Sequence, residues 1–392
     1  MPSQRSLVGL LDLFTGFEVL RPVVFPILAL KVGVGYLQIG EVLSLYAAVS
    51  TLFYYPASLL AQRLGTKRVV LLSQILMIIS TAILTLSVGF LAFTASYLLY
   101  GVVQAIYVQR ANLIAYNTKG VKESTAWFSL TNSLNLFGRV IATGSVALIG
   151  GAPSVELLRT GFGVLTLVEF VPLLLLRSLK EFRVTAKFSL MASKSAFGYG
   201  TGYLITGFGF GITATLLQVW FTRMGLGVNE VGLAYLGGYT FGMLGSGLGS
   251  AFARNVVFSF AVLSVAFAAA TVGLYLPVAI SLVSYMVYSF SRFARSVVGS
   301  GMRTEVFKDI GEVEKGLGVV SVMGGAGDIA GTFAQGALFG TNEFSLPFII
   351  GGASIVVGSA LNIIFYRQRF PAPGSTKPQT LSGAEAEQGS KA

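Results

Sequence analysis

Apolar runs of roughly 20 residues, each long enough to cross a bilayer as a helix, recur along most of the chain. Short polar or glycine-containing breaks separate them, and hydrophobic residues make up 54% of the sequence against 11% charged residues. The pattern predicts an all-α polytopic membrane protein. Weak breaks near Gly89 and Ala253 leave eleven spans as an alternative, but twelve are favoured: residues 7–29, 39–60, 69–90, 93–113, 125–149, 157–178, 196–221, 231–252, 256–276, 278–302, 316–340 and 345–366.

The composition excludes several kinds of site. The 392 residues include no Cys and no His, which removes thiolate and imidazole metal ligands, Ser-His and Cys-His nucleophile pairs, and disulfides. Proton chemistry would therefore have to use carboxylates, Lys or Tyr. Nothing matches the phosphate-binding pattern GxxxxGK[ST] of ATP-driven proteins. We expect no enzymatic activity, no metal site and no cofactor.

The distribution of Lys and Arg predicts the orientation, because short cytoplasmic loops carry the excess of positive residues. With the N-terminus inside, nineteen Lys and Arg fall in the predicted cytoplasmic segments, whereas only Lys31, Arg159 and Arg223 fall outside. Both termini are therefore expected in the cytoplasm, with the chain in the cytoplasmic (plasma) membrane. The same topology accounts for most of the net charge of +11, so no nucleic-acid partner is needed.

An internal repeat relates the two halves of the chain. KVGVGYLQIG (31–40) and RMGLGVNEVG (223–232) share a basic residue and three glycines in one register, at an offset of 192 residues. LNLFGRVIATGSVALIG (134–150) also resembles MGGAGDIAGTFAQGALFG (323–340). Each copy spans six predicted helices and begins inside, which predicts a parallel repeat about an axis along the membrane normal.

The repeat predicts the domain organisation. An N-terminal six-helix bundle covers residues 1–176, and a C-terminal six-helix bundle covers 196–369. Between them, 177–195 is the longest basic stretch and is expected to be a cytoplasmic linker. Residues 370–392 have little apolar surface to bury and are expected to form a disordered cytoplasmic tail.

Two six-helix halves joined by a basic loop resemble the major facilitator superfamily of secondary transporters, and one local motif agrees. SLLAQRLGTKRVVLL (58–72) resembles that family's loop signature GxLaDrxGrkxxl. Arg63, Gly65 and Lys67 match the signature, but Gln62 replaces its acidic residue. The resemblance implies that these residues belong to the inner gate, and the neutral amide puts a charge-based latch in doubt.

The resemblance also implies alternating access about a central site lined by the first and fourth helices of each half. Aromatic and polar side chains on those helices are candidates for substrate contact: Tyr100, Gln104, Tyr107, Tyr203 and Tyr288. A stripe of glycines in the eighth helix, at 238, 242, 245, 247 and 249, suits close helix approach or static packing within one half.

Ionisable side chains inside the membrane are costly, so each needs a partner or a wet cavity. Glu18 and Arg21 lie three residues apart on one helix face and are expected to pair. Either they only neutralise each other, or Glu18 is a proton-titrating group held ionised by Arg21. The remaining candidates are assigned gate or structural roles: Asp12 as a gate or interdomain contact, Arg110, Arg139, Glu169 as a partner for Arg139 or Arg110, and Asp328.

Arg292 and Arg295 also share a helix face, and a guanidinium suits carboxylate or phosphate. Either they bind an anionic substrate, or they pair with carboxylates such as Asp328 as gate structure.

The leading hypothesis is a secondary active transporter for a small, anionic organic solute, coupled to an ion, with a proton favoured. Symport and antiport, and import and export, stay open. One alternative is efflux of drugs or lipophilic cations, and another class is a non-transporting sensor or lipid scramblase on the same scaffold. The expected partners are the small-molecule substrate and the bilayer; the chain is expected to act as a monomer, because this architecture needs no second chain to line its path.

Overall fold

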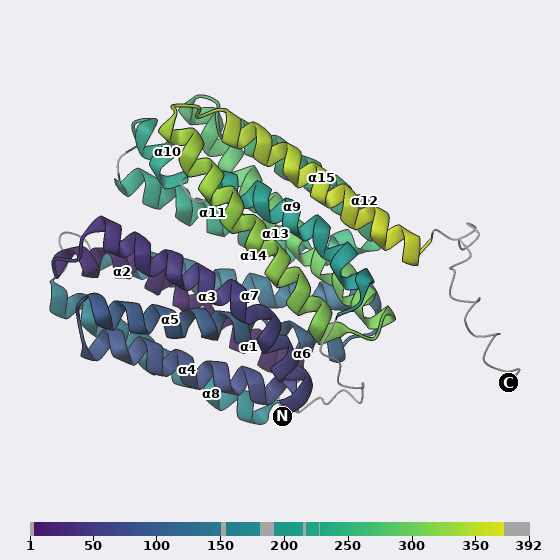
Figure 1. The fold of residues 1–392 in the computed structure, drawn as a ribbon, viewed down its shortest axis with the longest axis horizontal. Coiled ribbons are helices and arrows are strands. Elements are labelled where there is room, and N and C mark those ends of the chain that lie inside the picture. The colour runs from purple at the N-terminus through teal and green to yellow at the C-terminus, as the bar shows by residue number, and fades with distance from the viewer. Residues whose placement is uncertain (1–3, 150–153, 181–191, 215–216, 227, 372–392) are drawn as a thin grey trace, which may run out of the picture.

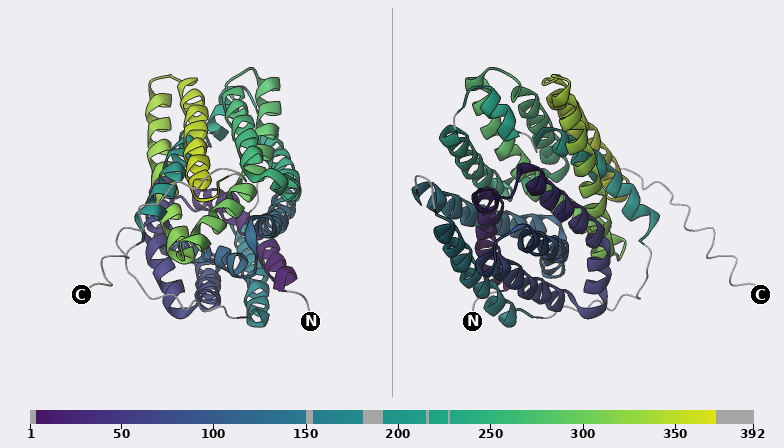
Figure 2. Two further views of the ribbon diagram at one scale, coloured as in Figure 1. Left: turned by 90° about the vertical axis from the view of Figure 1, so that its right-hand side faces the viewer. Right: turned by 60° about the vertical axis from the view of Figure 1, so that its left-hand side comes forward.

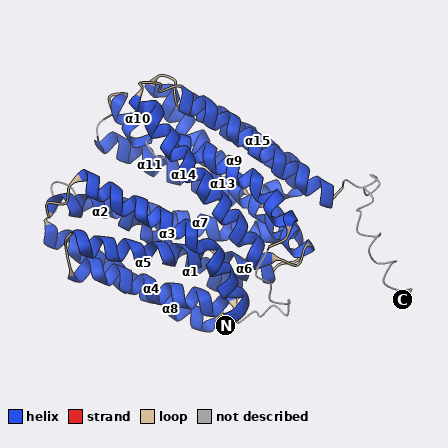
Figure 3. Cartoon of the chain, in the orientation of Figure 1, coloured by secondary structure: helices blue, strands red, loops and turns tan. Residues whose placement is uncertain are grey.

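The computed structural model describes residues 4–149, 154–180, 192–214, 217–226 and 228–371, which are almost entirely helical and include no strand (Figure 3). In chain order, the first half contains α1 (Gln4–Gly16), the 3₁₀ turn η1 (Phe17–Val19), α2 (Leu20–Lys31), α3 (Tyr36–Leu64), α4 (Thr66–Leu86), α5 (Phe90–Tyr107), α6 (Arg110–Tyr116), α7 (Gly120–Ile149) and α8 (Val155–Ser178). The second half contains α9 (Lys194–Ala214), α10 (Leu217–Arg223), α11 (Val228–Leu248), η2 (Ala251–Asn255), α12 (Val256–Gly273), α13 (Val278–Asp309), α14 (Val313–Gly340) and α15 (Leu346–Arg369).

Each of the twelve predicted spans corresponds to a described helix or to a run of helices. Gly89 has a φ of 132°, which favours glycine, and it separates α4 from α5; Ala253 lies in η2, between α11 and α12. Twelve spans, and not eleven, are therefore correct. Seven described segments are long and apolar enough to cross a membrane on length and composition alone: Glu41–Leu64, Thr66–Leu86, Phe90–Tyr116, Val155–Ser178, Ala251–Gly273, Val313–Phe339 and Leu346–Arg369.

The first span differs from its prediction because η1 divides it. Pro22 has no N–H to bond to the carbonyl of Glu18, as a regular α-helix would require. This missing donor accounts for a tighter turn just before the proline.

The helices form two bundles, α1–α8 and α9–α15 (Figures 1 and 2). The same pairs pack in each bundle. In the first they are α1 with α7, α1 with α8, α3 with α5, α4 with α5 and α4 with α8; in the second they are α9 with α14, α9 with α15, α11 with α13, α12 with α13 and α12 with α15. This correspondence confirms two pseudo-symmetric six-helix bundles. The predicted linker falls mostly, and the predicted tail almost wholly, outside the described residues.

Glycines allow equivalent helices to cross closely in the two bundles. Gly16 of α1 faces Gly138 of α7, and a side chain on either would collide with the backbone of the other helix. In the second bundle, Gly207 and Gly211 of α9 and Gly327 of α14 meet the facing backbone in the same way. These small residues bring the two backbones into direct contact.

The predicted glycine stripe lies on α11, except for Gly249, which follows its last residue. Side chains added at Gly238, Gly242, Gly245 or Gly249 would collide with α13, so these four glycines serve packing within the second bundle. Gly247 instead faces Ser133 of α7 in the first bundle.

The bundles contact each other through α7 with α11, α3 with α14, and α7 with α13. Two contacts join loop-proximal residues: the Tyr116 hydroxyl donates to the Glu314 carboxylate, and the Lys308 ammonium donates to the Thr118 carbonyl. We call the end of the molecule that holds these four residues the closed end. Figure 1 shows the bundles spread apart at the opposite end, where α2 and α10 lie.

The close crossing of α9 and α14 predicts a position-dependent effect of alanine. Gly327→Ala would place its Cβ against the Leu204 carbonyl and the Phe208 N–H, and we expect this overpacking to cost about 1–3 kcal/mol of unfolding free energy. Gly336→Ala on the same helix meets nothing within 4 Å and is the matched control. Thermal unfolding of the purified variants in detergent measures the difference; equal melting temperatures would contradict the close crossing.

Candidate functional site

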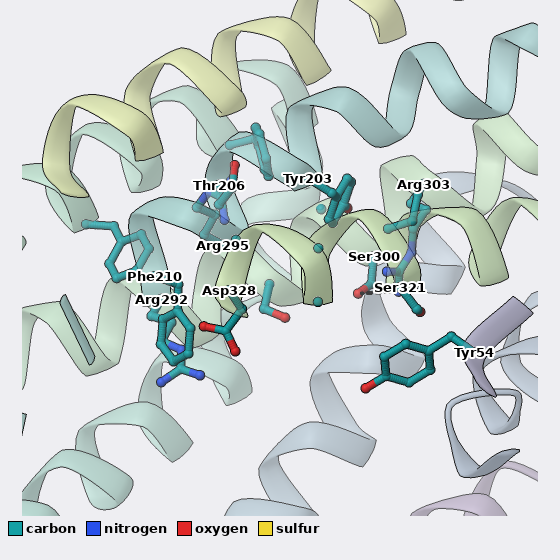
Figure 4. Close-up of a pocket in the computed structure, with 18 residues that line it drawn as sticks. Tyr54, Tyr203, Thr206, Phe210, Arg292, Arg295, Ser300, Arg303, Ser321 and Asp328 are labelled. Carbon is teal, nitrogen blue, oxygen red and sulfur yellow. Dashed lines mark hydrogen bonds between the residues drawn. The ribbon is translucent and has the colours of Figure 1, made fainter. Parts of the chain in front are cut away.

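The second bundle contains a cavity of about 410 Å³ (Figure 4). Its wall comes from α9, α12, α13 and α14, and Tyr54 of α3 is the contribution of the first bundle. The lining residues are Tyr54, Tyr203, Thr206, Gly207, Phe210, Phe260, Phe267, Arg292, Arg295, Ser296, Gly299, Ser300, Arg303, Val320, Ser321, Gly324, Gly325 and Asp328. The cavity is therefore aromatic, rich in hydroxyl groups and strongly basic.

Three arginines of α13 line this cavity. Arg292 and Arg295 were predicted to share a face, and the structure places both in the wall. Arg303 follows Arg292 by eleven residues, or about three helical turns, so it projects from the same side of α13. Arg303 directly follows the predicted span 278–302 and was therefore not predicted to line a cavity. Its eleven-residue spacing from Arg292 indicates the shared helix face.

Arg295 is surrounded by hydroxyl groups. Its Nε donates to Ser264 at 2.9 Å and its Nη2 donates to Ser359 at 2.8 Å, while its guanidinium lies 4.8 Å from the centre of the Phe260 ring. Within the described chain, no carboxylate makes a salt bridge to Arg295. Its charge is held by dipoles and an aromatic face, without a neutralising anion.

Arg292 lies at the other end of the cavity from Arg303 (Figure 4). Its guanidinium lies 4.0 Å from the centre of the Phe210 ring and 5.2 Å from that of Phe293. Asp328 of α14 is the one carboxylate in the described cavity wall, and it lies within electrostatic range of Arg292. Three guanidiniums against one carboxylate leave the cavity with a net positive charge, which favours an anionic ligand.

The first bundle neutralises its buried arginine internally. Arg21 was predicted to pair with Glu18, but it donates to Ser80 at 2.7 Å, to Thr81 and to Ser96, and it lies 3.9 Å from Glu169. This hydroxyl-lined socket with its own carboxylate satisfies the guanidinium better than one neighbour on the same helix. Glu169 is therefore the partner of Arg21, and the predicted pairing with Arg139 or Arg110 is wrong.

Asp12 and Arg110 form a second internal ion pair, with 2.9 Å between Arg110 Nε and Asp12 Oδ1. The Tyr107 hydroxyl lies 3.3 Å from the same oxygen, and the Arg110 guanidinium lies 4.5 Å from the centre of the Tyr107 ring. All three residues belong to the first bundle. Asp12 therefore has a partner within its own bundle, and the prediction of an interdomain contact is wrong.

Glu18 is buried with few partners. Its Oε2 accepts from Gln104 Nε2 at 2.9 Å, while its Oε1 is buried without a hydrogen-bond partner. Arg139, on α7, donates to Asn135 of its own helix at 2.9 Å and lies within electrostatic range of Glu18. Glu18 and Gln104, both candidates, are thus in contact, whereas Arg21 lies within electrostatic range of Glu18 without a hydrogen bond or salt bridge to it among the described residues.

Two expectations about the cavity differ from the structure. The first and fourth helices of the first half contribute no residue to its wall. Tyr100 instead stacks on Tyr46, with ring centres 5.1 Å apart, and the Arg21 guanidinium lies 4.3 Å from the centre of its ring. Tyr288 is buried against Phe267, with ring centres 4.8 Å apart, and is not part of the wall. Tyr203 of α9, the predicted seventh span, does line the cavity.

The loop signature has structural contacts inside the first bundle. Gly65 has a φ of 92°, which ends α3 and turns the chain into α4. Lys67 donates to the carbonyls of Arg177 and Leu179 at the C-terminal end of α8. Arg63 is exposed, and the side-chain amide oxygen of Gln62, at the acidic position of the signature, is buried without a hydrogen-bond partner.

Comparison with known proteins gives a consistent result. The model of the Major Facilitator Superfamily matches residues 7–311. Similar solved structures include the human organic anion transporter MFSD10 (TM-score 0.74, 14% identity, 92% of this chain and 100% of that chain). Others are the E. coli fucose:proton symporter FucP (0.73, 12%, 93% and 97%) and a bacterial homologue of the iron transporter ferroportin in an outward-facing state (0.72, 16%, 93% and 99%). No curated protein matches the chain in sequence.

The Arg21 socket predicts a non-additive stability effect. Arg21→Met would leave Glu169 buried without its cation and should cost about 3–5 kcal/mol, whereas adding Glu169→Gln removes the stranded charge. We expect the double variant to unfold at a higher temperature than the single variant. A double variant that is no more stable would show that the two residues are not energetically coupled.

Proposed function

The chain belongs to the major facilitator superfamily and is a secondary transporter in an integral membrane fold, not an enzyme; we propose that its substrate is a small organic anion and that transport is coupled to protons. The observation that carries this proposal is the charge of the cavity in the second bundle. Three guanidiniums face one carboxylate there, and Arg295 has hydroxyl groups where an ion-pair partner would be expected.

The contrast between the bundles strengthens the proposal. Arg21 and Arg110 each lie beside a buried carboxylate of the first bundle. An unpaired buried charge is costly, so a cavity that keeps one open to a solute is suited to binding the opposite charge. Aromatic rings of Phe210, Phe260 and Phe267 offer an apolar surface for the body of such a solute.

The orientation follows from the Lys and Arg distribution. With both termini in the cytoplasm, the closed end faces the cytoplasm and the protein is in an outward-facing state. One chain supplies the described cavity wall, which supports a monomeric transporter. We place this transporter in the plasma membrane. The division at residues 177–195, with a bundle on each side and a cytoplasmic tail after residue 369, fits this arrangement.

Glu18 is our candidate for proton coupling in the first bundle. Its Oε1 is buried without a partner, its Oε2 accepts one amide N–H, and Arg21, Arg110 and Arg139 lie within electrostatic range. A carboxylate in such a position changes protonation readily when neighbouring charges move.

A ligand panel tests the substrate class. An anion that binds only the folded state raises the melting temperature. At a hundredfold excess over Kd, it adds about 2.7 kcal/mol to the free energy of unfolding. We expect carboxylates or organic phosphates to stabilise the wild type and not Arg295→Gln, while exposed Arg254→Gln serves as the matched control. Stabilisation by lipophilic cations that survives Arg295→Gln would contradict the anion assignment and favour drug efflux.

Liposome assays test the coupling role of Glu18. Once an anion is identified, Glu18→Gln should abolish its accumulation driven by a pH gradient, because the variant has no proton to exchange at this position. Exchange of labelled for unlabelled anion at equal pH needs no net proton movement and should persist. Gradient-driven accumulation by the variant would exclude Glu18 as the coupling group.

A further inference from the structure

Asp328 occupies an unusual position in the proposed anion cavity. It lies in the wall on α14, on the same side as Arg292, and Figure 4 shows its carboxylate beside Arg292 and Phe210. Its Oδ1 is buried and accepts no hydrogen bond. Glu169, the structural carboxylate beside Arg21, also has one buried oxygen without a hydrogen-bond partner, but its Oε1 accepts from Thr81, whereas no hydrogen bond to Asp328 is found among the described residues. Asp328 has an oxygen free for a change of partner or of protonation.

The backbone of α9 creates the space for this carboxylate. A Cβ added at Gly211 would lie 2.8 Å from Asp328 Oδ1, so only glycine leaves room for it at the α9–α14 crossing. The same Cβ would lie 2.1 Å from the Asp328 carbonyl oxygen, so Gly211 permits the helix crossing as well, and the buried Oδ1 accepts no hydrogen bond there.

The charged and titratable neighbours of Asp328 come from two other helices. From α13, Arg292 and Tyr288 lie within electrostatic range, and Arg295 shares the cavity; from α3, Tyr54 lies within range. On α9, Tyr203 lines the same cavity nearer Arg303. Two other helices, α6 and α15, also pack against α14. Their groups Tyr116 and Arg369 bond to other carboxylates, those of Glu314 and Asp309. Arg292 is thus the dominant cation facing Asp328.

We propose that Asp328 and the substrate anion compete for Arg292, so that the anion binds together with one proton taken up by Asp328. This inference rests on the proposed anion transport. An ionised Asp328 repels an incoming anion and already compensates Arg292, whereas a neutral Asp328 leaves the guanidinium available. The proton comes from water in the cavity and stays on the carboxyl oxygen while the anion is bound.

The assignment differs from the role of Glu18. Glu18 belongs to the first bundle and does not line the cavity, whereas Asp328 shares the cavity with the anion. In the internal repeat, Asp328 corresponds to Arg139, so only the second bundle has a carboxylate at this position. Asp328 would therefore set the pH dependence of anion binding itself, independently of any later transport step.

The test measures binding, not transport. The probe is 2-naphthalenesulfonate, an aromatic anion whose charge stays constant across the range, titrated into purified protein by calorimetry at about pH 5.5 and about pH 8. We expect the wild type to bind about tenfold more tightly at the lower pH, because binding is linked to uptake of a proton. Asp328→Asn should bind with similar affinity at both pH values, close to the low-pH wild type.

Two further variants sharpen the result. Glu343→Gln makes the same chemical change at an exposed position of the second bundle, between α14 and α15, and should keep the wild-type pH dependence. Arg292→Gln removes the cation for which both anions compete, and should weaken binding at both pH values and flatten the pH dependence. Melting temperatures and gel filtration establish that each variant is folded.

Several outcomes would overturn the inference. Folded Asp328→Asn that retains the wild-type pH dependence, or that binds no probe at all, would show that Asp328 is not a competitor of the anion. Loss of the pH dependence in Glu18→Gln instead would assign it to the first bundle. Failure of the wild type to bind the probe or any other anion would contradict the proposed substrate class, whereas tight binding that ignores pH would contradict the role of Asp328 alone.

Discussion

The cost of burying charge in a bilayer governs how this chain distributes its chemistry. A charged side chain near the membrane centre needs an opposite charge, a set of dipoles or access to water. The first bundle uses the first solution, since Arg21 and Arg110 lie beside Glu169 and Asp12. The second bundle uses the other two, since Arg295 is held by Ser264 and Ser359 at the edge of a cavity. Two arginines of the first bundle are thus neutralised by carboxylates, whereas Arg295 in the second bundle is held by hydroxyl groups.

This difference arises although the two bundles have nearly the same arrangement of helices. Equivalent helix pairs pack in both bundles, and equivalent crossings depend on glycine. The sockets also resemble each other, because Arg21 bonds to Ser80 of α4 while Arg295 bonds to Ser264 of α12, the corresponding helix. The sockets differ at α8 and the corresponding α15, which supply the Glu169 carboxylate beside Arg21 and the Ser359 hydroxyl beside Arg295. The two arginines lie on α2 and α13, which are not equivalent helices, so the sockets are alike in chemistry and only the first contains a carboxylate.

Hydropathy predicted the twelve spans, because each span is a continuous run of apolar residues. The repeat at an offset of 192 residues predicted the two bundles. The choice of partner was less predictable. Glu18 and Arg21 suited a pair at three residues apart, yet Arg21 bonds to Ser80, which is 59 residues away. Nothing in local spacing reveals such a hydroxyl, because serine and threonine are also common where helices merely pack. Arg292 and Arg295 lie in the cavity wall, on the helix face that the sequence predicted. The contribution of α12 and α14 to the wall depends on how the helices cross, and residue spacing within one helix does not reveal that.

The closed end shows why such a cavity can change its access. Its contacts include Tyr116 with Glu314, Lys308 with Thr118, and Ser129 with the Ser246 carbonyl at 2.6 Å, and the signature position that would hold a carboxylate is Gln62. A hydrogen bond contributes about 0.5–1.5 kcal/mol net, and one to a charged group about 1.5–3 kcal/mol. Apart from the packing of α3 and α7 against the second bundle, the polar part of this closure is a few such bonds, and their free energy is similar to that of binding one small ligand. A solute that neutralises the cavity is then able to alter the balance between closed and open states, since only a differential affinity of comparable size is required.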